Sequence, residues 1–352
     1  MQTNNVSLRQ YHLDYLRVFA SVAIILLHVA TQNMNYVELA GTEWNIYNIC
    51  NGVSRWGVPV FVMISGAIFL DKNYKLDIKR LYKHNIFRMV ILYVVWSCLY
   101  GIFDCRDFDF AVVGIKGILR ELLYGRYHLW FIPMIVGIYM LLPVLKSWVE
   151  HTEKKNIEYF LLLFLVWKIG RETVGALIVT DEIHYILDLV KLELACSYVG
   201  YFVLGYYLAH IGIGAKLRRV VYCLTIPSAV MNIVLGNLLA WRAGEPVGDI
   251  YDSFGIFTFI MVTALFLFTL EKGSKVTFCA RGSKLIEELS ADTLGVYLIH
   301  MLLIEFLELY GIHSMMMPIA VGVPVLAVLV FIASLAISAG LRRIPLLGKY
   351  LC

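Results

Sequence analysis

The chain has 352 residues, of which 60% are hydrophobic and 16% charged, and its formal net charge is +4. Soluble domains are about 45–50% apolar and about 25% charged, so this composition excludes a soluble globule and predicts that lipid covers much of the surface. The basic residues occur in short clusters rather than in a tail, which argues against a nucleic-acid partner. The seven cysteines form no C-x-x-C pair and no Cys/His metal spacing, so no metal site is expected.

Ten apolar segments follow one another along the chain. A helix that crosses about 30 Å of hydrocarbon needs about 20 mostly apolar residues, so these segments predict an all-α polytopic membrane protein with about ten transmembrane helices. The predicted spans are 15–35, 52–70, 87–104, 127–146, 157–177, 193–210, 219–240, 253–271, 292–311 and 318–341. Residues 1–352 are expected to form a single integral-membrane domain without an appended soluble domain, and 108–124 an amphipathic helix on the membrane surface.

The loops between these segments differ in positive charge. With a cytoplasmic N-terminus, 20 of the 30 Lys and Arg residues fall on the cytoplasmic side and eight on the other side. Cytoplasmic loops of membrane proteins are enriched in Lys and Arg. The distribution therefore predicts both termini in the cytoplasm of a multi-pass protein of the cell (inner or plasma) membrane.

The first predicted span carries polar residues on one face. Arg17 and His28 are eleven residues apart, which is about 20° beyond three full turns and about 16 Å along the axis. Asp14 lies three residues before Arg17, where the two can pair, and Thr31 and Gln32 continue the stripe beyond His28. Ionisable residues within spans usually face the bundle interior and mark functional sites. The alternative is an interfacial ion pair with a histidine bonded to a neighbouring helix.

Four sequence motifs occur in a fixed order. They are "RVFASVAIILLH" (17–28), "WGVPVFVMISGAIFL" (56–70), "YHLWFIPMIVGIYMLLPVL" (127–145) and "LGVYLIHMLLIE" (294–305). In order and content these motifs resemble the membrane acyltransferase-3 family: the first is similar to its Arg-x10-His helix, the second to its P-x-F-x-x-x-S-G span. The resemblance covers nearly the whole chain.

This resemblance implies transfer of an acyl group, usually acetyl, from cytoplasmic acyl-CoA to a hydroxyl of a cell-surface glycan or its lipid-linked precursor. Acetyl-CoA would be a co-substrate, with no tightly bound cofactor. The donor is anionic, so positive side chains at the cytoplasmic mouth are expected to hold its phosphates. The candidate donor-binding residues are Arg17, Arg80, Lys83, Arg88 and Ser65.

His28 is the candidate general base, because neutral histidine commonly accepts the proton of an attacking alcohol near pH 7. Arg17 and Asp14 complete the predicted catalytic group. Ser65 and the Gly66 backbone are candidate oxyanion donors, with close helix packing through small residues as the alternative. Both direct transfer and an acyl-enzyme intermediate are compatible with these residues.

The predicted acceptor-binding residues lie toward the outer side. They are His128, Trp130, His300 and Glu305. Trp130 also suits the aromatic belt of the membrane interface, and His300 also suits a structural hydrogen bond inside the bundle. The chain departs from the family at the start of the third span, where an R-x-x-R pair is common: Arg88 fits the second position, but Asn85 occupies the first.

Two other classes of function compete with acyl transfer. A transporter or flippase would also carry buried charges, but the two halves of the chain show no inverted repeat. A non-catalytic membrane sensor usually carries a fused domain, and none is seen here. Besides donor and acceptor, the expected partner is the lipid bilayer, and the sequence is compatible with an oligomer.

Overall fold

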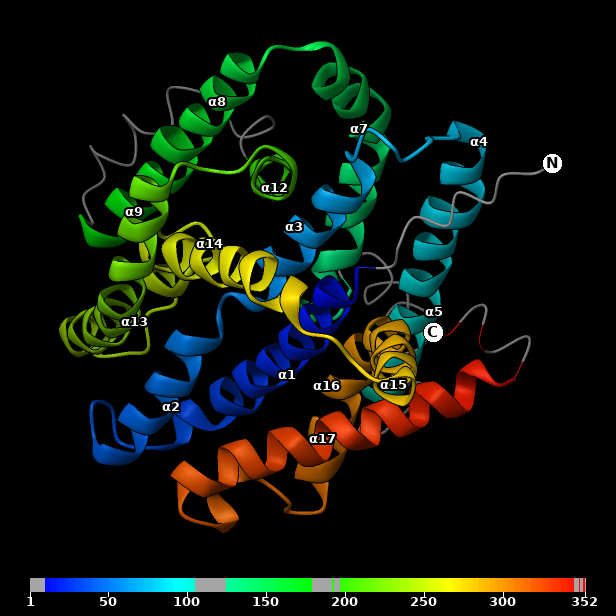
Figure 1. Ribbon diagram of the computed structural model, residues 1–352. Helices are drawn as coiled ribbons and strands as arrows, with labels where there is room; N and C mark the ends of the chain where they lie inside the picture. The colour runs from blue at the N-terminus through cyan, green and yellow to red at the C-terminus, as the bar shows by residue number, and fades with distance from the viewer. Residues whose placement is uncertain are drawn as a thin grey trace.

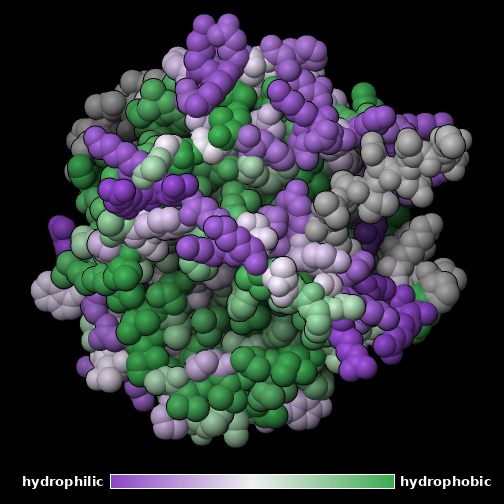
Figure 2. All heavy atoms as spheres, viewed as in Figure 1, coloured by the Kyte–Doolittle hydropathy of each residue, from purple (hydrophilic) through white to green (hydrophobic). Residues whose placement is uncertain are grey.

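The computed structural model describes residues 10–104, 125–178, 192, 197–344, 348 and 351. All regular elements within these ranges are helices, as the composition predicted (Figure 1). The expected surface helix at 108–124 lies outside the described residues. The face in Figure 2 carries hydrophilic residues along its upper edge and mostly hydrophobic residues over its lower half.

Within the described residues, seven helical stretches are long and apolar enough to cross a membrane. They are Tyr11–Tyr36, Thr42–Phe69, Ile78–Asp104, Tyr127–His151, Ala215–Ala243, Ile256–Lys275 and Ile319–Arg342. Their main helices are α1 (Tyr11–Asn33), α2 (Thr42–Ser54) followed by α3 (Gly57–Phe69), α5 (Phe87–Asp104), α7 (Phe131–His151), α13 (Ala215–Ala243), α14 (Ile256–Glu271) and α17 (Ile319–Arg342). Each overlaps a predicted span. An eighth candidate is a bent pair, α15 (Ala280–Ala291) and α16 (Thr293–Leu309), whose axes differ by 56°.

The two remaining predicted spans are helical but fail as membrane-crossing helices on length or charge. The first comprises α8 (Lys154–Leu163), a π-helical turn and α9 (Gly170–Leu177), and it carries six charged residues, Lys154, Lys155, Glu158, Lys168, Arg171 and Glu172. The described part of the second, α12 (Tyr198–Tyr206) with the π-helix Tyr207–Ile211, reaches only about 20 Å at 1.5 Å per residue. The predicted count of ten spans is therefore not confirmed, and the sidedness of the termini stays a prediction.

α1 is the central helix of the bundle. It packs against α2, α3, α14, α15, α16 and α17, and Figure 1 shows it between α3 and α17. Its apolar residues that are buried against these neighbours include Leu13, Leu16, Ile25 and Val29. Because α1 touches so many neighbours, its polar residues face other helices rather than lipid.

α12 and α3 approach each other closely through two glycines. A side-chain carbon added at Gly66 of α3 would collide with the backbone carbonyl of Phe202, and one added at Gly205 of α12 would collide with the backbone of Met63. Small residues allow membrane helices to pack backbone against backbone. The "ISG" of the second motif thus serves helix packing at Gly66, the alternative reading of that motif.

Gly66→Ala is expected to lower thermal stability, because the new methyl group would meet rigid backbone and overpacking of this kind costs about 1–3 kcal/mol. The matched control is Gly137→Ala in α7, where no atom lies within 4 Å of the added carbon. Thermal unfolding of the detergent-solubilised variants measures the difference. Equal melting temperatures for the two variants would contradict close packing at Gly66.

The predicted sidedness can be measured with two single-cysteine variants in a chain whose native cysteines are replaced. Glu245 lies in the segment before α14 and Ser274 in the turn after it, and both side chains are exposed. Glu245→Cys should react with a membrane-impermeant maleimide in intact cells, and Ser274→Cys only after permeabilisation. The reverse pattern would place the termini outside.

Candidate active site

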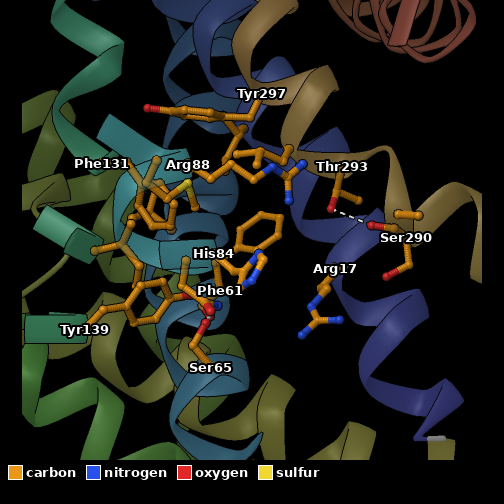
Figure 3. A pocket seen from close by; sticks show the side chains of 17 residues that line it. Arg17, Phe61, Ser65, His84, Arg88, Phe131, Tyr139, Ser290, Thr293 and Tyr297 are labelled. Atoms are coloured by element: carbon orange, nitrogen blue, oxygen red, sulfur yellow. Dashed lines mark hydrogen bonds between the residues drawn. The ribbon is translucent and has the colours of Figure 1, made fainter. Parts of the chain in front are cut away.

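A cavity of about 350 Å³ opens between α1, α3, α5, α7 and the α15–α16 bend. Its lining extends along α1 from Arg17 to Ile24 and along α16 from Thr293 to Tyr297. Figure 3 shows Arg17 and Ser65 on opposite sides of the space, with Tyr297 near its top. We call it the Arg17 cavity.

Asp14 holds Arg17 at the edge of this cavity. The Arg17 Nη1 lies 3.1 Å from Asp14 Oδ1, and the Ser290 hydroxyl donates to the same oxygen at 2.8 Å. Asp14 is buried and the Arg17 side chain is 28% exposed, with its guanidinium directed toward the cavity (Figure 3). The predicted pairing at i and i+3 is therefore present. Asp14 orients Arg17 but is not one of the described residues that line the Arg17 cavity.

The predicted basic loop is helical. The Asp77 carboxylate accepts a hydrogen bond from the Arg80 amide and caps the start of the helix, and a π-helix at Leu81–Ile86 continues into α5. This winding brings three residues of the segment, His84, Asn85 and Arg88, into the lining of the Arg17 cavity.

Two of the residues in this segment that were predicted to bind the acyl donor lie outside the lining of the Arg17 cavity. Arg80 and Lys83 are exposed and do not line the described cavity, whereas Arg88 does. His84, which lines the cavity together with Arg88, was not a predicted site residue, because the segment was expected to be a loop. Ser65 also lines the cavity, and its hydroxyl donates to the Phe61 carbonyl at 3.0 Å.

Three histidines from three helices form a buried group, which we call the histidine cluster (His28, His128 and His300). The ring centre of His28 lies 5.2 Å from that of His300 and 6.4 Å from that of His128, and the last two are 5.4 Å apart. His128 and His300 are almost fully buried, and His28 is half-buried. Sequence reasoning selected all three residues, but on separate grounds.

Tyrosines surround the cluster and join it to the Arg17 cavity. The Tyr297 hydroxyl donates to the backbone carbonyl of His128, and Tyr297 itself lines the cavity. The ring of Tyr100 lies 4.9 Å from that of His128, and the ring of Tyr127 lies 5.7 Å from that of His28. Tyr127 and Tyr297 lie in the third and fourth motifs and Tyr100 lies outside all four, but none of the three was a predicted site residue.

A second cavity of about 350 Å³ is lined by Gln32, Asp104, Arg126, Glu305, Glu308 and Leu309. We call it the Glu305 cavity. Arg126 bridges Asp104 Oδ2 and Glu305 Oε1, each at 2.6 Å, and the Gln32 amide donates to Glu308. Arg126 was not predicted as a site residue.

The histidine cluster lies between the two cavities. Along α1 the order is Ile24 of the Arg17 cavity, His28, then Gln32 of the Glu305 cavity, with about 6 Å for each four-residue step. Along α16 the corresponding order is Tyr297, His300 and Glu305. Both helices therefore pass from a basic cavity through imidazoles to a carboxylate-rich one.

Trp130 stands apart from this arrangement. Its side chain is 43% exposed, its ring packs 5.4 Å from that of Tyr198, and it lines neither cavity. This position suits the aromatic belt that the sequence left open as an alternative.

Within the described ranges, no group of three or more His, Cys, Asp or Glu side chains has the geometry of a metal site. A neutral imidazole has one donor nitrogen and one acceptor nitrogen, so each ring of the cluster can both donate and accept a hydrogen bond.

Comparison with known families adds an independent finding. The family model described as an acyltransferase domain, acyltransferase-3, matches residues 10–343, nearly the whole chain. Comparisons with curated proteins and with solved structures give no match. Together with the apolar helices, the family match supports a multi-pass membrane acyltransferase.

Proposed function

This chain belongs to the acyltransferase-3 family, and we propose that it transfers an acyl group, in particular acetyl, from cytoplasmic acyl-CoA to a hydroxyl of a cell-surface glycan or its lipid-linked precursor. One observation carries the proposal: His28 lies on α1 between a basic cavity and a carboxylate-rich cavity, and beside His300 of α16, the other helix that lines both cavities. Acyl transfer across a membrane needs an acid–base group that is accessible from both sides.

The Arg17 cavity suits the donor. Acyl-CoA carries phosphates that bind guanidinium groups through charge-assisted hydrogen bonds, and Arg17 and Arg88 line this space together with His84. The exposed Arg80 and Lys83 add positive charge to the helical segment that carries His84 and Arg88. A bound donor would extend its narrow pantetheine arm past Ile24 and Tyr297, with the thioester directed toward His28.

The Glu305 cavity suits the acceptor. Carboxylates and amides accept and donate hydrogen bonds at sugar hydroxyls, and Glu305, Glu308 and Gln32 offer both types of group. Arg126 holds Glu305 in place through its 2.6 Å contact. The acceptor hydroxyl would approach the histidine cluster from this side, with His128 as a wall.

The reaction itself requires one proton to move. His28 takes the proton of the acceptor hydroxyl as the oxygen attacks the thioester carbonyl carbon. The new C–O bond forms a tetrahedral intermediate, which collapses with cleavage of the C–S bond. The departing CoA thiolate receives the proton from His28, so that the histidine ends in its starting state.

His28→Ala is expected to reduce label transfer from radiolabelled acetyl-CoA to a glycan acceptor by about 10²-fold or more, because the general base is lost. The matched control is His151→Ala, an exposed histidine in α7, which should behave as wild type. Robust transfer by His28→Ala would remove His28 from the mechanism. Uptake of the glycan into vesicles without donor turnover would favour the transporter alternative.

Arg88→Gln is expected to raise the KM for acetyl-CoA by about tenfold or more, since a charge-assisted hydrogen bond contributes about 1.5–3 kcal/mol. The effect should be much smaller with acetyl-pantetheine, which lacks the nucleotide phosphates. Lys284→Gln, at an exposed position of α15, is the control. An equal rise in KM for both donors would contradict phosphate binding by Arg88.

A further inference from the structure

The hydrogen bonds of His300 determine which of its ring nitrogens carries the proton. Its Nδ1 lies 2.6 Å from the Tyr297 carbonyl oxygen and 3.2 Å from the Val296 carbonyl oxygen. Carbonyl oxygens only accept hydrogen bonds, so Nδ1 must be the donor. In the neutral imidazole the proton then resides on Nδ1, and Nε2 presents a lone pair.

This lone pair is buried without a partner. His300 is 0% exposed, and its Nε2 has no hydrogen-bond partner among the described residues. An unsatisfied buried acceptor costs about 1–3 kcal/mol, and most buried polar atoms in folded proteins are paired. Nε2 therefore lacks a hydrogen-bond donor here. We expect another state of the site to supply one.

His28 is the closest side chain of the cluster that could supply it. The two ring centres are 5.2 Å apart with their planes tilted by 38°, and two imidazoles joined by an N–H···N bond of about 2.9 Å have ring centres roughly 5 Å apart. The Tyr297 hydroxyl is already donated to the His128 carbonyl. The His28 ring has no hydrogen bond of its own within the described residues, so it is free to turn toward Nε2.

We propose that His300 is a positioning residue for His28: its Nε2 accepts an N–H from His28 when substrates bind, and this bond directs the unprotonated nitrogen of His28 at the acceptor hydroxyl. The inference rests on the proposed acyl transfer. Histidine bases are commonly oriented by a partner that binds their other nitrogen. Here the partner is a neutral histidine whose tautomer is fixed by backbone carbonyls.

The proton balance is simple in this arrangement. The hydroxyl proton passes to His28 and then to the CoA thiolate, while the N–H between His28 and His300 stays on His28. His300 keeps its Nδ1 proton throughout and neither touches the substrates nor changes charge. Its loss should therefore lower kcat and leave the KM of both substrates unchanged.

Two substitutions separate this role from packing. The amide nitrogen of His300→Asn can replace the Nδ1 donor toward the Tyr297 carbonyl but does not reach the position of Nε2. The amide oxygen of His300→Gln can occupy the Nε2 position and accept from His28. We expect kcat to fall about 10²-fold in His300→Asn and less than about tenfold in His300→Gln, with KM and melting temperature near wild type.

The matched control is His151→Asn, because His151 Nδ1 also bonds a backbone carbonyl four residues earlier, that of Ser147 at 2.8 Å, but at an exposed position. It should retain wild-type kcat. Full activity in both His300 variants, equal loss of kcat in both, or a change in KM without a change in kcat would each overturn the positioning role.

A spectroscopic readout makes the outcome independent of activity. In proteoliposomes containing ¹⁵N-histidine-labelled protein, His300 should show a protonated Nδ1 and an unprotonated Nε2, assigned by comparison with His300→Asn. With acetyl-CoA bound, a coupling between His28 and His300 Nε2 is expected. Protonation of Nε2, or a coupling that disappears in His128→Asn and not in His28→Asn, would overturn the inference. If the wild type transfers no acetyl group, the proposed function is refuted, whereas the spectroscopic test of the bond between His28 and His300 is unaffected.

Discussion

The arrangement of this protein depends on keeping unpaired polar groups away from lipid. A bilayer offers no water to hydrogen-bond a buried imidazole or guanidinium, so each such group must face another helix or a cavity. α1 carries both kinds of group, and it is packed on nearly all sides by other helices. Asp14 and Ser290 pair with one another beside Arg17, whereas both ring nitrogens of His128 and the Nε2 of His300 remain without partners among the described residues.

Close helix packing sets the positions of the two cavities. Gly66 and Gly205 let α3 and α12 meet backbone to backbone, which fixes the side of α3 that faces α1 and presents Ser65 and Phe61 to the Arg17 cavity. The bend at Asp292, where Arg342 and Ser338 bind the carboxylate at 2.9 Å each, sets the direction of α16. Rigid packing on both flanks therefore holds the histidine cluster between the cavities.

The two cavities differ in charge, so the two ends of the histidine cluster face different electrostatic environments. Arg17 and Arg88 make one cavity basic, whereas the other contains three carboxylates and one arginine. Under the proposed function, the basic cavity would attract an anionic thioester, and the carboxylates of the other cavity would accept hydrogen bonds from the acceptor hydroxyls. The resemblance of four motifs to acyltransferases is thus matched by the family comparison over residues 10–343, and the geometry offers a physical reason why that chemistry suits a membrane bundle.

The sequence by itself determined the helical class, the family and the polar face of α1, because apolar run length and the 100° helical repeat are local properties. It also selected His28, His128 and His300 one by one. Only the tertiary structure decided that these three rings meet, that Arg88 and His84 line the cavity while Lys83 does not, and that Tyr297 joins the cavity to the cluster. These contacts join residues far apart in sequence, and the π-helix at Leu81–Ile86 changes which side chains share a face. Neither effect leaves a periodic signal in the chain, since both arise from how one helix packs against another.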